Sequence, residues 1–253
     1  MKKLIYILLL FPSFVFAQAA TNLTDSEQFY IVKAREDLKN KDYKSSIENY
    51  TAAINLNPKN VLSYVNRATA KWDLKDNEGA IEDFKLAIAL NGKYSWIYYN
   101  DIGLIKMDEK DDKGAISAYS KSIKLYPSGP TYNNRALAEL ANSDYSAAIK
   151  DLTIALNNQN GPNLKASPSA YLVKGNQYSL RGKAEMLNGD TKAAINDLDT
   201  AININPKLAL AYNTRGEAKN RSGDKDGACA DWKTAVGLGN DDAKENINKY
   251  CGK

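Results

Sequence analysis

Apolar and polar residues follow a helical period between residues 61 and 92. Val61, Val65, Ala68 and Trp72 recur at the spacing of one helix face. A second set continues this spacing after a polar gap: Ala80, Ile81, Phe84, Ala87 and Ile88. Asp76 ends the gap, where a carboxylate can accept backbone N–H bonds at the start of a helix. The pattern predicts two short amphipathic helices joined by a tight turn.

The same pattern recurs along the chain with a period near 34 residues. Self-comparison aligns six units, which begin near residues 27, 61, 96, 129, 175 and 209. In every unit the fourth residue is tyrosine, the eighth is alanine or glycine, and the sixteenth is aspartate. The twentieth and twenty-seventh residues are small, and the twenty-fourth is large. Such repetition predicts helix pairs that bury their apolar faces by stacking on one another.

These positions resemble the tetratricopeptide repeat. The resemblance runs from Glu27 to about Asn240. It implies an all-α fold, a right-handed superhelical solenoid of helix–turn–helix repeats (an alpha-alpha superhelix) whose first helices line a concave face. Within residues 24–240 we expect repeats at 27–60, 61–95, 96–128, 129–162, 175–208 and 209–240, with an insertion at 163–174. Residues 241–251 are expected to form a capping helix, because a solenoid must cover its last apolar face.

The fifth unit begins late. A polar stretch precedes Ser167-Pro168, which is typical of a helix start. The helix predicted from Ser169 to Met186 would be about three turns longer than its counterparts. It could serve as a docking element, or the insertion could simply pack against its neighbour.

The first 17 residues have the features of a cleaved secretory signal peptide. Lys2 and Lys3 precede an apolar run from Leu4 to Phe16, and small Ala17 follows. We therefore expect residues 1–17 to be removed and the protein to be exported, either periplasmic or secreted. No later stretch is apolar enough to span a bilayer, so we expect no integral membrane segment in the mature chain.

Composition argues against several function classes. The formal charge of +4 falls to +2 when Lys2 and Lys3 are removed, and no basic run remains, so nucleic-acid binding is not expected. The chain has no histidine and no glycine-rich phosphate loop. We therefore expect no catalytic, cofactor-binding or metal site, and the protein is not expected to be an enzyme.

The two cysteines, Cys229 and Cys251, are expected to form a disulfide. They lie about ten residues before and about eleven after the turn that precedes the capping helix. Those positions face each other in an antiparallel helix pair, so the bond would fix the cap. Two buried free thiols are the alternative.

Arginine and aspartate occur together at the seventh and twenty-third positions. The pairs are Arg67 with Asp83, Arg135 with Asp151, Arg181 with Asp197, and Arg215 with Asp231. The third unit has Ile102 and Ala118 instead. Because the two residue types appear together or not at all, we expect partly buried structural ion pairs. A row of arginines for an acidic ligand is the alternative.

A ligand face is expected from the remaining first-helix positions. The candidate peptide-binding residues on the concave face are Val65, Thr69, Trp72, Asn100, Leu104, Met107, Asn133, Leu137, Leu140, Lys183 and Met186. They combine apolar anchors with amides that can bond a peptide backbone. Alternatively, Trp72, Met107 and Leu140 pack against the adjacent repeat.

Some members of the resembling family hold a C-terminal carboxylate through an asparagine in one first helix and two cations in the next. Asn66 fits the first requirement, but Ile97 and Asp101 stand at the other two positions. We therefore do not expect that mode of binding.

The leading prediction is a non-catalytic, exported scaffold that binds a protein or peptide of unknown identity. A structural envelope module that self-associates without a peptide ligand is the alternative, and a regulatory subunit of an enzyme complex is a remote one. The first of these rests partly on the resemblance, because fold alone does not fix function.

Overall fold

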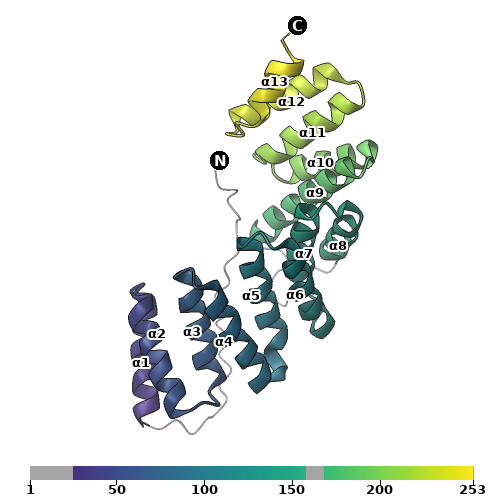
Figure 1. The fold of residues 1–253 in the computed structure, drawn as a ribbon. Helices are drawn as coiled ribbons and strands as arrows, with labels where there is room; N and C mark the ends of the chain where they lie inside the picture. Colours follow the sequence, from purple (N-terminus) through teal and green to yellow (C-terminus); the bar gives the residue numbers. More distant parts are fainter. Residues whose placement is uncertain (1–24, 158–167, 253) are drawn as a thin grey trace.

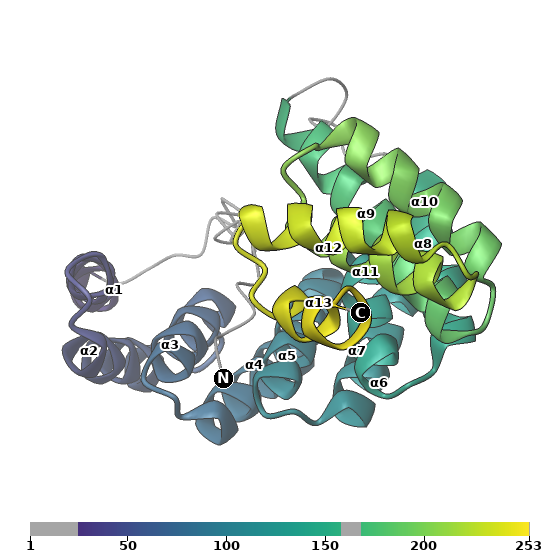
Figure 2. The ribbon, with the colours of Figure 1, turned by 90° about the horizontal axis from the view of Figure 1, so that it is seen from above.

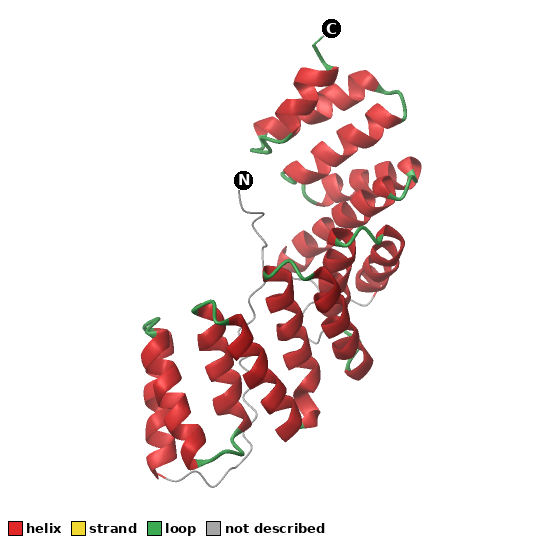
Figure 3. Cartoon of the chain, in the orientation of Figure 1, coloured by secondary structure: helices red, strands yellow, loops and turns green. Residues whose placement is uncertain are grey.

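The computed structural model describes residues 25–157 and 168–252, and helices make up nearly all of them (Figure 3). The predicted signal peptide and the first part of the predicted insertion, residues 163–167, lie outside the described residues. Within the described ranges the chain contains helices and no strand. None of these helices is long and apolar enough to cross a membrane.

The helices are short and follow one another closely along the chain. They are α1 (Asp25–Lys39), α2 (Tyr43–Leu56), α3 (Val61–Asp73), α4 (Asn77–Leu90), the 3-10 turn η1 (Gly92–Tyr94), α5 (Ser95–Asp108), α6 (Asp112–Leu125), α7 (Gly129–Ala141), α8 (Tyr145–Asn157), α9 (Pro168–Leu187), α10 (Thr191–Ile204), α11 (Ala209–Arg221), α12 (Lys225–Gly237) and α13 (Ala243–Tyr250).

Successive helices pack as pairs, from α1–α2 to α11–α12, and each pair stacks on the next. The result is an elongated, curved solenoid with α1 at one end and α13 at the other (Figure 1). Seen from above, the curve brings α13 over the middle of the array while α1 stays at the far edge (Figure 2). The all-α solenoid predicted from the repeats is confirmed.

Each pair turns through one residue with a positive φ followed by a capping aspartate. Lys75 has φ +67°, and the same place in the last pair is taken by Gly223, with φ +91°. Asp76 then accepts the backbone N–H of Gly79 at 3.0 Å, and Asp224 accepts that of Gly227 at 2.9 Å. The left-handed residue closes the first helix and the carboxylate opens the second, so the turn needs only three residues.

The small eighth residue of each first helix faces the large twenty-fourth residue of its partner. A Cβ added to Gly103 would lie 2.4 Å from the Tyr119 ring, and one added to Gly216 would lie 2.6 Å from Trp232. Tyr119 and Trp232 are almost fully buried. Glycine at these two positions therefore makes room for the Tyr119 and Trp232 rings between the paired helices.

Helix α9 extends one residue beyond each end of the predicted range Ser169–Met186. It has 20 residues, whereas α3 has 13 and α1 has 15, so it is longer than these first helices by at most about two turns and not by three. It begins at Pro168, where the missing N–H of proline costs no hydrogen bond.

Candidate functional site

The concave face, defined as the exposed side of the first helices α3, α5, α7, α9 and α11, carries a row of amides. The Asn134 side-chain N–H donates to Asn100 Oδ1 at 3.3 Å, which joins α7 to α5. Asn66 and Asn133 are half-buried in the same band of the helices. Such amides still have donor and acceptor capacity, because one bond uses only part of what each can make.

Asp101 is the charged member of this band. Its side chain is half-buried, and no cation in the described part of the chain forms an ion pair with it. Burial raises the pKa of Asp101 to about 7, although a hydrogen bond to Asn100 acts in the opposite direction. The carboxyl group is thus held where a ligand donor could meet it.

Two of the predicted face residues belong to the core. Val65 and Met186 are buried, Val65 with Tyr64 and Phe84 and Met186 with Ala194 and Leu198. Their inclusion in the face was wrong, because the core around each of them includes residues of the second helix of its own repeat.

Several other predicted face residues are half-buried against a neighbour. Trp72 packs on the α3–α6 core and its Nε1–H donates to Asp108 Oδ2 at 3.1 Å. Leu104 and Met107 pack against Tyr119, and Leu140 packs against Leu152. These side chains pack mainly against the core of the solenoid, and only their outer edges are accessible to a ligand.

The rest of the predicted face is accessible. Thr69 is exposed and its hydroxyl donates to Val65 O at 3.1 Å. Leu137 and Lys183 are half-buried. Lys183 faces Glu217 closely enough to lower the pKa of that glutamate, but burial is the larger effect and the net shift is upward.

The four expected arginine–aspartate pairs are present, each with two hydrogen bonds. Arg67 Nε and Nη2 donate to Asp83 at 2.8 and 2.7 Å. The corresponding distances are 2.6 and 2.9 Å for Arg135–Asp151 and for Arg181–Asp197, and 2.8 and 2.6 Å for Arg215–Asp231. The planar guanidinium matches the carboxylate in each case. Each pair joins the two helices of one repeat.

The third nitrogen of each arginine bonds to the preceding repeat. Nη1 donates to an acceptor on the second helix before it: Arg67 to Thr51 at 3.0 Å, Arg135 to Ser120 at 3.0 Å, Arg181 to Thr153 at 3.1 Å and Arg215 to Asp199 at 2.6 Å. Sequence reasoning missed these acceptors. The signal was available, since the twenty-fifth residue is an acceptor before every arginine-bearing unit and is Lys85 before the unit with Ile102.

A tyrosine ring completes the contact. Each arginine lies over the tyrosine three residues before it, at 5.4 to 5.6 Å from the ring centroid, and the pairs are Tyr64–Arg67, Tyr132–Arg135, Tyr178–Arg181 and Tyr212–Arg215. Three nitrogens of each guanidinium therefore bond to the protein, and one of its faces is covered by a ring. This arrangement leaves it little capacity for an acidic ligand.

We call each arginine, its aspartate and the residue four positions after the arginine an arginine cluster. In two clusters that residue is lysine: Lys71 Nζ lies 2.9 Å from Asp83, and Lys219 Nζ lies 2.9 Å from Asp231. In the other two it is Glu139 or Glu185, whose carboxylates lie 3.6 and 3.8 Å from Arg135 and Arg181. The four clusters share one geometry but not one charge.

The glutamates in these clusters favour the protonated state. Burial, followed by the charge of Asp151, raises the pKa of Glu139 to about 7 despite Arg135. Burial and Asp197 do the same for Glu185, whose pKa is also about 7. One oxygen of each glutamate is buried without a hydrogen-bond partner among the described residues, which explains why ionisation is unfavourable.

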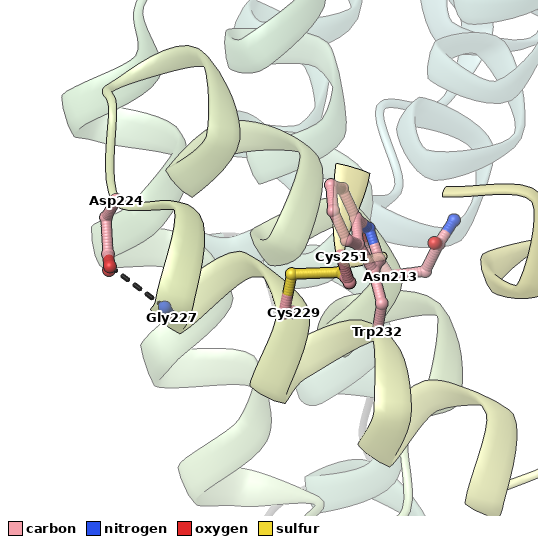
Figure 4. The surroundings of a disulfide bond; sticks show 6 residues. All are labelled: Asn213, Asp224, Gly227, Cys229, Trp232 and Cys251. Carbon is pink, nitrogen blue, oxygen red and sulfur yellow. Dashed lines mark hydrogen bonds between the residues drawn. A yellow bond between two sulfur atoms is a disulfide. The ribbon is translucent and has the colours of Figure 1, made fainter. Parts of the chain in front are cut away.

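Cys229 and Cys251 form a disulfide that ties α12 to the end of α13 (Figure 4). Beside it, Trp232 is buried, stacks on Tyr250 with the ring centroids 5.6 Å apart, and donates its Nε1–H to Asn213 O at 3.2 Å. The disulfide and the ring stack together attach the terminal helix to the α11–α12 pair.

No group of histidine, cysteine and acidic residues in the described ranges could hold a metal ion. The chemistry of the face is therefore that of hydrogen bonds, apolar edges and a few half-buried charged groups, among them Asp101, Lys183 and Glu217. Such a surface suits recognition of a chain segment.

Comparison with known proteins supports the repeat assignment. Residues 31–95 and 98–128 match family models described as tetratricopeptide repeat. A yeast protein from Saccharomyces cerevisiae, small glutamine-rich tetratricopeptide repeat-containing protein 2, is 30% identical over 126 residues, which make up 50% of this chain and 34% of that protein. The chain thus matches about a third of the length of this curated relative.

Solved structures share the fold. YrrB, described as a TPR protein with an unusual peptide-binding site, has a TM-score of 0.64 and 15% identity, covering 79% of this chain and 97% of YrrB. A repeat protein from Cytophaga hutchinsonii has a TM-score of 0.62 and 16% identity, with 81% and 77% covered. PilW, described as a type IV pilus biogenesis factor, has a TM-score of 0.60 and 17% identity, with 83% and 92% covered.

Proposed function

The chain belongs to the tetratricopeptide repeat family, and from that premise we propose that it is a non-catalytic scaffold that binds an extended peptide or protein segment on its concave face. Proteins of this family act as interaction scaffolds, and one solved structure with the same fold is described as having a peptide-binding site. The partner is a protein whose identity the chemistry of the face does not name.

The observation that carries this proposal is the amide band with Asp101 in it. Asn100 and Asn134 bond to each other across two repeats, and Asn66 and Asn133 flank them. An extended peptide presents alternating N–H and C=O groups, which amides can satisfy at successive repeats. The arginines are not the binding groups, because helices and rings of the protein already engage them.

Export is part of the proposal. The apolar run from Leu4 to Phe16 has the character of a secretory signal. A disulfide between Cys229 and Cys251 suits an oxidising compartment, because cytosolic proteins rarely keep such bonds. The scaffold would then act in the envelope or outside the cell.

The proposal is tested by selecting ligands from a phage-displayed library of random twelve-residue peptides against the purified protein. Peptides recovered from the library are then measured by fluorescence anisotropy against Asn100→Ala and Asn133→Ala. Each substitution removes an amide contact, so we expect affinity to fall about 5- to 30-fold per variant.

Asn196→Ala serves as the matched control, because Asn196 is an exposed amide on α10, a second helix. It should bind the same peptides with wild-type affinity. If the two face variants bind as tightly as the control, or if the library yields no ligand, the proposed function is wrong.

A further inference from the structure

The outer face of α1 exposes a stripe of apolar residues. Phe29 is 61% exposed and Val32 is 51% exposed, and Leu56 on α2 is 51% exposed beside them. Asp25, Phe29, Val32, Glu36 and Lys39 follow one another at alternating spacings of four and three residues, which is the stripe that packs helix against helix. Helix α1 ends the solenoid, so no other described helix covers this side (Figure 2).

The opposite side of α1 is firmly held. Ile31 and Ala34 are buried against the neighbouring helix. The buried Glu27 carboxylate accepts N–H bonds from Asn60 at 2.6 Å and from Asn57 at 3.1 Å, which ties α1 to the connection between α2 and α3. The exposed stripe is therefore the outer surface of an anchored helix.

The other end of the solenoid is closed differently. Helix α13 buries Ala243 against α12, and its outward residues include Lys244, Glu245 and Lys249. One end thus has a polar, disulfide-tethered cap, whereas at the other end no described helix covers the apolar stripe of α1. A polar cap and an apolar stripe do not complement each other, so stacking of one copy's α13 on another copy's α1 is disfavoured.

We propose that the α1 face docks on the α1 face of a second copy of this chain, with the two helices antiparallel about Val32. Val32 lies at the midpoint of α1, so a twofold axis there opposes it to Val32 of the partner subunit. Asp25 then meets Lys39 of the partner subunit at both ends of the helix pair. The ends of the stripe are complementary in this arrangement, because Asp25 stands in the first turn of α1 and Lys39 stands in its last turn.

A shallow hollow next to the stripe fits this partner. It is lined by Asp25, Ser26, Phe29, Tyr30 and Leu56. The apolar stem of Lys39 from the partner subunit can lie along Phe29 and Leu56 while its ammonium reaches Asp25. The same contact forms twice in a symmetric dimer.

The dimer goes beyond the proposed scaffold function because it leaves both concave faces free. Two binding faces on one particle allow bivalent attachment to a repetitive partner, which raises the apparent affinity without new contacts. The interface of one short helix per subunit is small, so we expect a weak dimer with a dissociation constant of roughly 10–100 µM.

Analytical ultracentrifugation of the purified protein across this concentration range tests the dimer. We expect a monomer–dimer equilibrium that Val32→Glu shifts to monomer, because two carboxylates would meet on the axis. Leu86→Glu is the matched control, since Leu86 is 47% exposed on α4, away from the stripe, and should leave the equilibrium unchanged. Circular dichroism checks that both variants are folded.

Charge reversal separates the antiparallel α1 pair from any other dimer. Asp25→Lys and Lys39→Asp should each be monomeric alone, because like charges then oppose one another. A mixture of the two variants restores both opposite-charge contacts and should form a heterodimer.

Three results would overturn the proposal: a wild-type protein that remains monomeric at millimolar concentration, a dimer that Val32→Glu does not weaken, or a mixture that stays monomeric. Hydroxyl-radical footprinting of Phe29 in a monomeric wild-type protein would then show whether another segment of the chain covers the stripe. Failure here leaves peptide selection on the concave face intact, so the two proposals fail independently.

Discussion

The arginine clusters of α3–α4 and α11–α12 hold their aspartate between two cations, whereas those of α7–α8 and α9–α10 place a second carboxylate beside the arginine. The hydrogen-bond geometry is the same in all four. One residue position, four after the arginine, decides the charge of the whole cluster. A repeat can thus keep its packing while the charge of the residue beside the arginine–aspartate pair changes.

This difference sets what each cluster tolerates. Asp83 and Asp231 are nearly inaccessible and each lies against two cations, so removal of Asp83 leaves Arg67 and Lys71 without a counterion, whereas removal of Asp231 leaves Arg215 with Asp199. Asp151 and Asp197 share their arginine with a glutamate whose pKa of about 7 leaves it about half protonated at neutral pH. In the glutamate clusters a second carboxyl group can therefore ionise and pair with the arginine when the aspartate is removed.

The largest expected effect is the loss of a lysine-cluster aspartate. Asp83→Ala should lower the free energy of unfolding by about 3 to 5 kcal/mol, because it strands Arg67 and Lys71 in a poorly solvated site. Asp151→Ala should cost less, about 2 kcal/mol, since Glu139 can ionise and take over Arg135. Urea unfolding followed by circular dichroism measures both.

Equal losses of unfolding free energy for Asp83→Ala and Asp151→Ala would contradict the difference between the lysine clusters and the glutamate clusters. Asp226→Ala is the control, because Asp226 is exposed on α12 and makes no cluster contact; it should change stability by less than about 0.5 kcal/mol.

The next effect is a dependence on pH. The pKa values of Glu139 and Glu185 are raised from 4.5 to about 7 in the folded protein, so the unfolded chain releases these protons first as pH rises. Their contribution to stability is full below pH 4.5 and is lost as pH rises through about 7. Glu139→Gln with Glu185→Gln should flatten this part of the profile by on the order of 3 kcal/mol per substituted glutamate.

Urea midpoints between pH 4.5 and pH 8 provide the readout. Asp101, whose pKa is raised in the same direction, keeps a residual slope in the double variant. A slope that the two glutamine substitutions leave unchanged would mean that neither glutamate titrates in this window. Lys71→Glu is the converse test. It builds a glutamate cluster in α3–α4, so it should steepen the dependence of the urea midpoint on pH.

A smaller effect is expected at the contacts between repeats. Thr51→Val and Thr153→Val each remove one neutral acceptor from an arginine Nη1 and should cost about 1 kcal/mol. The cost should be alike in a lysine cluster and a glutamate cluster, because this bond lies on the far side of the guanidinium. A cost confined to one type would show that the fourth-position residue controls the whole cluster.

The smallest effect is expected from Asp199→Ala. Asp199 accepts from Arg215 at 2.6 Å, but its side chain is about half exposed, so solvent screens the charge. The loss should be below about 1 kcal/mol at physiological salt and should shrink further in 1 M NaCl, measured by thermal unfolding.

Much of the fold could be read from the sequence because its determinants are local. The capping aspartates, the small residues opposite large rings and the arginine–aspartate pairs recur at fixed positions, so six copies reinforce one another. The burial of Val65 and Met186 could not be read this way. It depends on how closely the helices pack around these two side chains, which the repeat period alone does not give.

The candidate face was harder to predict for the same reason. Burial raises the pKa of Asp101, and the position of this residue in its repeat does not reveal that burial. The acceptors of the arginine Nη1 groups also recur at one position of the repeat: Thr51, Ser120, Thr153 and Asp199. Their role as acceptors becomes visible only when each repeat is compared with the repeat that follows it.

Ile102 interrupts the chain of arginine contacts at one junction. Elsewhere an arginine fastens each repeat to the one before it, whereas α5 meets α4 through apolar packing such as the Phe84–Tyr98 ring stack. Charge-assisted hydrogen bonds hold their partners in one fixed geometry until they break. Apolar surfaces can slide past one another gradually under a pulling force. A solenoid pulled from its ends would therefore part first between α4 and α5, and it would break into a block of two repeats and a block of four.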